Sequence, residues 1–360
     1  MPAKGLHSTS ASGFDVAVVG GGVIGLSAAW RARSRGLSVV VFDRGELGAA
    51  TTRVAAGMLA PSSEADAQER ALLALGIESA RMWGAFAAEL LDVSGVDVGL
   101  RTTGTLAVAR DGDEKAALER ELRLFDRLGL RARRLLPSAA RTLEPALAPS
   151  IRMAVEFPDD HSVDPRALTD ALVAACERAG VELRPRTEVT SLDALDAAQV
   201  VVAAGPWSAG LAPLPVRPVK GQTIRLRGAP LLERTLRYES GYLVPRADGR
   251  LIVGATMEER GFDTAMTAHA VHELLRDAAE LVPGILECEV EELVAGLRPG
   301  TPDNAPLIGR LDDRIVVATG HHRNGILLAP VTARLVAAEL AGESDDHAFS
   351  PHRFTTRAPV

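Results

Sequence analysis

A glycine-rich turn joins an apolar strand to a helix near the start of the chain, and few folds accommodate it. Residues 14–19 form an apolar, β-branched run, as expected for a buried strand, and residues 20–25 read Gly-Gly-Gly-Val-Ile-Gly. The pattern predicts a helix over Val23 to Ser34 and a second strand over residues 37–42, ending on Asp43. Because a helical crossover returns the chain in the same direction, we expect the two strands to be parallel.

The spacing of Gly20, Gly22 and Gly25 is typical of a dinucleotide site. Gly20 allows the tight turn, Gly22 lets a pyrophosphate approach the backbone, and Gly25 lets the helix pack on the strand. The helix N-terminus then presents N–H groups and the positive end of its dipole to the phosphate. Asp43 follows at the distance where an acid accepts hydrogen bonds from the ribose, with Arg44 beside it. The alternative is an ordinary glycine turn without a ligand.

The rest of the chain departs from the alternating pattern of a nicotinamide-binding domain. A loop of small residues over 48–61 and an amphipathic stretch over 64–91 follow the second strand. Buried strand patterns return before Gly205 and Gly320, and residues 213–299 between them read as antiparallel strands. We therefore expect an α/β fold with an α+β insert. A Rossmann-like nucleotide-binding domain is built from discontinuous segments and joined to a substrate domain with an antiparallel sheet.

A length of 360 residues suits two intimately joined domains. The expected boundaries are 14–92, 146–212 and 300–345 for the nucleotide-binding domain, 93–145 and 213–299 for the substrate-binding domain, and 1–13 and 346–360 for flexible tails.

Composition indicates which cellular compartment and which classes of binding partner to expect for this chain. A net charge of −7 supplies no basic face for nucleic acid or an anionic membrane. No run reaches the roughly 18 apolar residues of a membrane span, and residues 1–13 lack the apolar region of a signal peptide. Only two cysteines, Cys176 and Cys288, are present, which fits a reducing compartment. We expect a cytoplasmic protein with neither a nucleic-acid nor a membrane partner.

Three further segments are candidates for contacts with the nucleotide. Thr51 and Thr52 are followed by small residues, which suits a loop lying against a diphosphate or a ring edge, although a solvated loop has the same composition. A strand ending at Gly205 is typical of a sheet that passes an adenosine, with Trp207 packing nearby. Residues 318–330 read as strand, polar loop and apolar helix, so the helix N-terminus is expected to face the ligand. The histidine pair in this loop has no third residue at metal-ligand spacing, so no metal is predicted.

Arg298 is the candidate for binding a substrate. It lies between glycine and proline residues in an apolar neighbourhood, which is a poor place for a surface charge. Its planar guanidinium matches a carboxylate through two parallel hydrogen bonds. A structural ion pair is the alternative.

Together, in this order, these motifs resemble the D-amino-acid-oxidase superfamily of flavoproteins, and most closely its glycine-oxidase branch in bacterial thiamine biosynthesis. The resemblance covers nearly the whole chain outside the tails. The stretches that carry it are VVGGGVIG, TTRVAAGMLAP, VKGQ, YLVPR, GRLIVGATME, AGLRPGTPDNAPLIGR and GHHRNGILLAP.

The resemblance implies non-covalently bound FAD. Its contacts fall on the glycine turn, the loop of small residues, a strand holding Val189, the turn at Gly205 and the loop after residue 320. The residues concerned are Gly20, Gly22, Val23, Ile24, Gly25, Asp43, Arg44, Thr51, Thr52, Ala56, Gly57, Met58, Val189, Gly205, His321, His322, Asn324, Gly325, Ile326 and Leu327.

The resemblance also implies four catalytic positions. Arg298 pairs with the substrate carboxylate, Arg323 lies beside it, and Tyr242 and Met257 wall a small pocket. The chain departs from the family pattern at Ser240, where relatives carry histidine, and this departure leaves open how the amine is handled.

The implied reaction is oxidative deamination of glycine or a small amine such as sarcosine or D-alanine. It consumes O2 and yields glyoxylate or its imine, ammonia and hydrogen peroxide. The imine would supply thiazole formation, with hand-over to thiazole synthase and a homo-oligomer both compatible with the family. The alternatives are a sarcosine or D-amino-acid oxidase or dehydrogenase of the same superfamily, and a nucleotide-binding protein without redox activity. Arg298 argues against the latter, because a purely structural site needs no carboxylate anchor.

Overall fold

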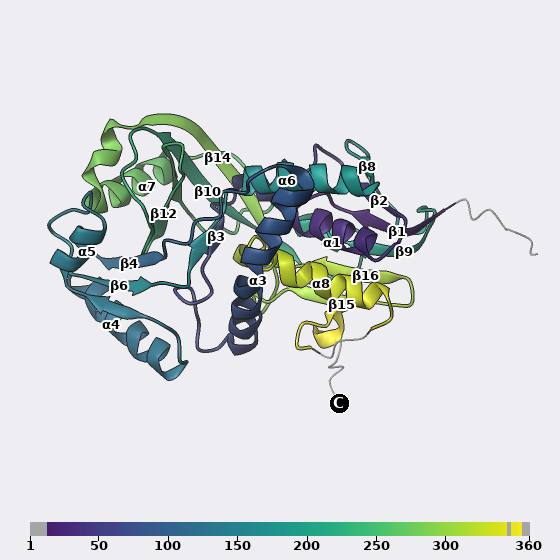
Figure 1. The fold of residues 1–360 in the computed structure, drawn as a ribbon, viewed down its shortest axis with the longest axis horizontal. Coiled ribbons are helices and arrows are strands. Elements are labelled where there is room, and N and C mark those ends of the chain that lie inside the picture. Colours follow the sequence, from purple (N-terminus) through teal and green to yellow (C-terminus); the bar gives the residue numbers. More distant parts are fainter. Residues whose placement is uncertain (1–12, 344–346, 355–360) are drawn as a thin grey trace, which may run out of the picture.

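Two β-sheets with their own helices lie side by side in the computed structural model, which describes residues 13–343 and 347–354 (Figure 1). The expected tail residues 1–12 and 355–360 lie outside the described residues. Within the described ranges, no helix is both long and apolar enough to cross a membrane.

The first sheet has six strands in the order β15-β16-β9-β1-β2-β8. All neighbours pair in parallel except β15, which is antiparallel to β16. The strands are β1 (Phe14–Val19), β2 (Val39–Phe42), β8 (Glu182–Arg184), β9 (Ala197–Val202), β15 (Leu307–Arg310) and β16 (Ile315–Thr319). One layer is thus assembled from widely separated segments, as expected from the sequence.

Four helices cover one face of this sheet and form the largest apolar core with it. They are α1 (Val23–Ser34), α3 (Arg70–Ser94), α6 (Pro165–Ala179) and α8 (Ala329–Leu340). The residues that cap α6 are of the types typical of helix ends. Asp164 accepts a hydrogen bond from the amide of Arg166 at 2.9 Å, and Gly180 ends the helix at φ +78°.

The second sheet has eight strands in the order β14-β10-β13-β12-β11-β4-β6-β5. It is antiparallel except where β11 runs parallel to β4. The strands are β4 (Thr105–Ala109), β5 (Arg133–Leu135), β6 (Met153–Phe157), β10 (Arg217–Arg227), β11 (Thr235–Tyr238), β12 (Gly241–Pro245), β13 (Arg250–Gly254) and β14 (Glu289–Gly300).

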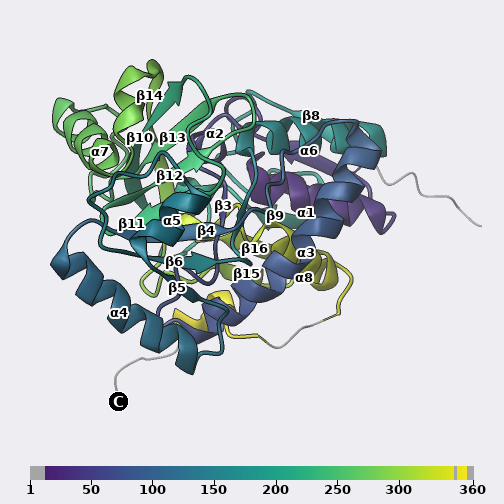
Figure 2. The ribbon, with the colours of Figure 1, turned by 60° about the vertical axis from the view of Figure 1, so that its left-hand side comes forward.

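Helices cover the second sheet unequally (Figure 2). One face packs against α5 (Pro137–Leu143) and α7 (Ala268–Leu281), while α4 (Gly112–Arg127) packs on the other face only near β4 and β6. The uncovered part of that second face, formed by β10, β12, β13 and β14, is turned toward the first sheet. It is therefore available to line a site between the two sheets.

Three expectations about the organisation need correction. Residues 146–157 were assigned to the nucleotide-binding domain, but β6 (Met153–Phe157) pairs with β4 and β5 in the second sheet. The loop over 48–61 contains a short helix, α2 (Thr51–Val54), and a short strand, β3 (Met58–Leu59). Val189 lies in a loop after β8 and not in a strand.

Part of the expected C-terminal tail packs against the first sheet. Phe349 is buried in the largest core, and its carbonyl accepts a hydrogen bond from the amide of Ile308 at 2.9 Å. A short 3-10 helix, η4 (Pro351–Phe354), follows. Burial of this aromatic ring explains why the chain stays ordered past residue 346, where the polar composition had suggested a tail.

Candidate active site

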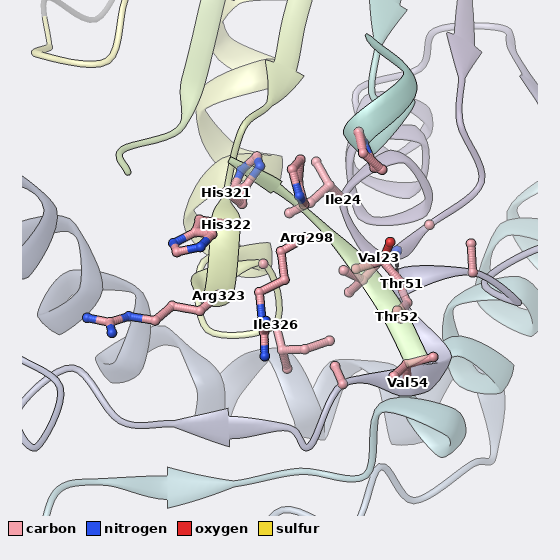
Figure 3. A pocket seen from close by; sticks show the side chains of 18 of the residues that line it. Val23, Ile24, Thr51, Thr52, Val54, Arg298, His321, His322, Arg323 and Ile326 are labelled. Carbon is pink, nitrogen blue, oxygen red and sulfur yellow. Dashed lines mark hydrogen bonds between the residues drawn. The ribbon is translucent and has the colours of Figure 1, made fainter. Parts of the chain in front are cut away.

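A cavity of about 1090 Å³ runs between the two sheets, at the upper end of the size range of small-molecule and cofactor sites. Its walls come from the glycine turn, the segment 42–58, the loops after β8, β9 and β16, and strands of the second sheet. Figure 3 shows Arg298 and the histidines facing the residues around α2 and the start of α1. Of the predicted site residues, all line this cavity except Gly25 and Leu327.

The three glycines of the turn have different roles. Gly20 has φ +112°, and a Cβ there would lie 2.3 Å from the carbonyl oxygen of Ala203. A Cβ on Gly25 would lie 1.8 Å from the carbonyl oxygen of Gly20. Both positions therefore require glycine for the turn itself. A Cβ on Gly22 would lie no closer than 3.3 Å to any protein atom, so this glycine faces open cavity.

The first turn of α1 offers unpartnered donors to the cavity. The amide of Val23 donates to the hydroxyl of Thr52 at 3.1 Å. The amides of Ile24 and Gly25 have no hydrogen-bond partner within residues 13–343 and 347–354, and of these two residues only Ile24 lines the cavity. Such orphan donors at a helix N-terminus suit a phosphate group, so the turn fits the pyrophosphate of a dinucleotide.

Asp43 holds the glycine turn in place. One carboxylate oxygen accepts from the amide of Gly21 and the other from the amide of Gly45, both at 2.8 Å. Asp43 also lines the cavity. The guanidinium of Arg44 lies 3.8 Å from the centre of the Trp207 ring, which stacks on Phe262. Trp207 is thus a packing residue, as expected.

The loop of small residues spans both sheets. The hydroxyl of Thr51 donates to the carbonyl of Leu297 at 2.6 Å, which ties α2 to β14. Val54 packs against Gly296 of β14, since a Cβ on Gly296 would lie 2.9 Å from the Val54 side chain. Gly57 adopts φ +83°, and Ala56 packs on β12 and β13. The loop therefore forms a close-packed wall of the cavity.

Arg298 extends into the cavity from near the C-terminal end of β14 (Figure 3). Its Nη1 donates to the carbonyls of Thr256 at 3.1 Å and Lys220 at 3.4 Å. Gly221 on the neighbouring strand makes room for the guanidinium, since a Cβ there would lie 2.4 Å from Nη1. No carboxylate within the described part of the chain pairs with Arg298. The alternative of a structural ion pair therefore lacks a partner, and the guanidinium is free to bind an anionic ligand.

Tyr242 lies beside Arg298, and its ring covers Gly254 on β13. Burial raises the pKa of the phenol, opposed by the nearby positive charge of Arg298, so the hydroxyl stays protonated at neutral pH. Met257 lines the cavity but is 60% exposed, which places it at the entrance. Of the two large side chains expected to wall the pocket, Met257 therefore lies at the rim. Ser240 donates to the carboxylate of Asp277 on α7 at 2.6 Å.

Arg323 points away from Arg298 in Figure 3. Its Nε lies 3.5 Å from the carboxylate of Glu64, and its Nη2 donates to the Glu64 carbonyl at 3.2 Å. An arginine held this way lies at the rim of the cavity. The predicted role beside the substrate requires a change in its side-chain conformation.

The two histidines after β16 are neutral at pH 7. His321 is buried, its Nε2 lies 3.0 Å from the hydroxyl of Thr332, and burial lowers its pKa to about 3. Burial, together with three nearby arginines, lowers the pKa of His322 to about 4. Neither group is suited to carrying a positive charge. No three potential metal ligands converge within the described ranges.

The segment after His322 differs from the expectation. A 3-10 helix, η3 (His322–Asn324), and a turn separate the histidines from α8, so the N-terminus of α8 does not line the cavity. Leu327 is buried in the core, and its carbonyl accepts from Ser79 and Trp83. Residues 321–326 form the cavity wall instead.

Sequence reasoning missed several cavity residues. Thr256 and Gly221 contact or accommodate the Arg298 side chain, and Glu64 holds Arg323. Thr256 and Gly221 lie within the stretches GRLIVGATME and VKGQ, which marked them as members of the family pattern without indicating a role. Glu64 carries no local signal, because only the tertiary fold brings it to Arg323.

Comparison with known proteins agrees with this arrangement. Residues 15–339 match the family model "DAO: FAD dependent oxidoreductase". A glycine oxidase from Geobacillus kaustophilus is 36% identical over 90% of this chain and 92% of its own length. The crystal structure of glycine oxidase from that organism superposes with a TM-score of 0.90 at 34% identity, covering 96% of this chain and 99% of that one.

A second kind of relative is larger. A bifunctional protein ThiO/ThiG from Trichormus variabilis is 34% identical over 95% of this chain, which spans 55% of that relative's length. The family model, the glycine oxidase sequence and its structure all extend over nine-tenths or more of the present chain. This chain belongs to the DAO family of FAD-dependent oxidoreductases.

Proposed function

We propose that the chain catalyses oxidative deamination of glycine and of small amines such as sarcosine and D-alanine, with O2 as the electron acceptor. The observation that carries the proposal is the unpaired guanidinium of Arg298, which extends into a cavity continuous with the glycine turn. Relatives that are similar to this chain over nine-tenths or more of its length include proteins named glycine oxidase.

In the proposed reaction, Arg298 binds the substrate carboxylate through two parallel hydrogen bonds. Binding there fixes the α-carbon relative to the rest of the cavity, which is catalysis by positioning. Bound FAD would supply the acceptor for a hydride from the α-carbon and the route by which its two electrons reach O2, giving hydrogen peroxide. The amide of Ile24 at the start of α1, and the loop from Thr51 to Met58, are the groups proposed to hold it.

The substrate amine reacts uncharged in this scheme. The guanidiniums of Arg298 and Arg323 disfavour an additional positive charge in the cavity. His321 and His322 are neutral and hydrogen-bonded or buried, so neither is needed to take up a proton in the chemical step. The role proposed for the protein is therefore to orient the amino acid.

FAD is proposed to be held without a covalent bond. Cys288 does not line the cavity, and the Nε2 of His321 is engaged by Thr332. Flavin released intact into the supernatant after acid precipitation is the expected result.

The imine product hydrolyses to glyoxylate and ammonia, or passes to thiazole formation in thiamine biosynthesis. Relatives that combine ThiO with ThiG in one chain support such a hand-over to thiazole synthase. We propose a cytoplasmic location, which the free Cys176 and Cys288 support. Formation of a homo-oligomer stays a prediction.

A sarcosine or D-amino-acid oxidase is the second candidate. Met257 is 60% exposed at the cavity entrance, and this exposure favours a wall that does not close against a larger substrate substituent. Initial rates of peroxide formation with glycine, sarcosine, D-alanine and D-phenylalanine distinguish the candidates. We expect kcat/KM to be highest for glycine or sarcosine, and a maximum for D-phenylalanine would exclude the glycine assignment while leaving the flavin-oxidase assignment intact.

A further inference from the structure

On the cavity-facing side of the second sheet, the side chains change along the strands from small or apolar ones to charged ones. Next to Arg298 the neighbouring strands present Gly221 and Tyr242, and the middle of the face carries small or apolar side chains. Beyond the middle of the face, the same side of the strands carries charged side chains at two adjacent positions of the register, and these side chains are called the row below. Its members are Arg225 on β10, Arg246 just after β12, Arg250 on β13 and Glu292 on β14.

Two members of this row are buried arginines. Arg225 is 1% exposed and Arg246 is 5% exposed. They share their carboxylate neighbours with two outer arginines. Glu292 lies 3.1 Å from Arg225 and also pairs with Arg166. Asp164 lies 2.6 Å from Arg250, and its distance from Arg246 is longer, at 3.8 Å. The buried guanidiniums therefore carry positive charge without a carboxylate of their own.

Burying a charge is costly, so these arginines require a compensating role. Nη1 of Arg225 and Nε of Arg246 have no hydrogen-bond partner among residues 13–343 and 347–354. Their satisfied nitrogens donate to backbone instead. Arg225 Nη2 donates to the carbonyl of Arg53 at 2.7 Å, and Arg246 Nη2 donates to the carbonyl of Ala56.

These contacts orient the wall of the cavity. The carbonyls of Arg53 and Ala56 are turned toward the arginines, at the end of α2 and just beyond it. The amides of Ala56 and Gly57 have no hydrogen-bond partner among the residues that the structure describes, and both residues line the cavity. The loop thus presents donors to the cavity and acceptors to the buried arginines.

We propose that Arg225 and Arg246 are positioning residues for the flavin, which hold loop 53–57 with its amides toward FAD and place positive charge behind that loop. Preorganised donors and a nearby positive charge stabilise the negative charge gained on reduction. The two arginines therefore raise the reduction potential of bound FAD. This inference rests on FAD occupying the cavity, and it does not depend on which amine is the substrate.

The test compares flavin midpoint potentials measured without substrate. Arg225→Met and Arg246→Met are each expected to lower the potential and to weaken FAD binding by about tenfold, the scale of one lost hydrogen bond to a charged group. Arg227→Met is the matched control, because Arg227 lies on the same strand and pairs with Glu291 at the surface. Its potential and FAD affinity should equal those of the wild type.

A second pair of variants tests the charge while leaving both buried arginines in place. Glu292 is partly exposed, so Glu292→Gln removes a negative charge from the row and is expected to raise the potential. Glu291→Gln, next to it and paired with Arg227, should leave the potential unchanged. Unchanged potentials in Arg225→Met and Glu292→Gln, with only a lower melting temperature, would show that the row is structural and would overturn the proposal. If the methionine variants fail to fold, the Glu292→Gln result alone decides. Because no amine is present, either outcome is independent of the proposed glycine reaction.

Discussion

At the scale of single residues, the site depends on where a side chain is absent as much as on where one is present. Gly221 leaves the space that the Arg298 guanidinium occupies, and Gly254 does the same for the Tyr242 ring. The importance of Arg298 could be predicted from its glycine and proline neighbours. The roles of Gly221 and Gly254 could not, because they depend on the register of β10 with β14 and of β12 with β13.

Gly221→Ala should displace the guanidinium, since the new Cβ would lie 2.4 Å from Arg298 Nη1. We expect KM for glycine to rise about tenfold, equivalent to about 1.4 kcal/mol, with FAD binding unchanged. Steady-state peroxide kinetics and flavin titration measure the two effects. Gly84→Ala is the control, because a Cβ there meets no atom within 4 Å. An unaltered KM in Gly221→Ala would show that Arg298 does not depend on this space.

His321 should make the protein sensitive to acid. Its folded-state pKa of about 3 lies below its ordinary value of 6.5, so its contribution to stability is complete above pH 6.5 and is lost as the pH falls toward 3. Each pH unit in that window costs about 1.4 kcal/mol. His321→Gln should therefore flatten the fall in unfolding free energy between pH 7 and about pH 4.5 by about 2–3 kcal/mol, measured by denaturant titration. The exposed His269→Gln is the control, and identical pH profiles for wild type and His321→Gln would contradict the assignment.

At the scale of elements, local signals predicted the structure wherever a turn or cap decides it. The strand, glycine turn and helix over 14–34 lie where the sequence predicted them. The expected strand at Val189 and the expected approach of the α8 N-terminus to the cavity were wrong for a different reason, and Leu327 does not line the cavity for that reason too. Each depends on whether an apolar residue faces a sheet, a cavity or the core. Leu327 lies in the core, where its carbonyl accepts hydrogen bonds from Ser79 and Trp83.

The glycine turn should fail in two distinct ways. Gly25→Ala places a Cβ 1.8 Å from the carbonyl of Gly20, so the apoprotein should be strongly destabilised. Gly22→Val points into open cavity, so the apoprotein should keep its melting temperature but no longer bind FAD. Thermal unfolding of apoprotein and flavin titration separate the two. Normal FAD binding by Gly22→Val would mean that the phosphates lie elsewhere.

At the scale of the whole molecule, the reaction site forms because two sheets of different construction meet. The first supplies the dinucleotide turn, and the second supplies Arg298 and Tyr242. The two-sheet architecture could be predicted from the change from alternating helices and strands to antiparallel patterns. The place of β6 in the second sheet could not be predicted. Its pairing with β4 and β5 joins segments that are distant in the sequence, and no turn residue marks that pairing.

The central claim is that Arg298 anchors the carboxylate of an amino-acid substrate in a flavin site. It is tested most directly by measuring kcat/KM of wild type and Arg298→Ala for glycine and for a small primary amine without a carboxylate. Loss of one partner of a buried charge pair costs about 2–5 kcal/mol, so kcat/KM for glycine should fall about a hundredfold or more. The amine should be affected far less, and FAD content should be unchanged. Equal losses for both substrates would contradict the account and make Arg298 a structural residue.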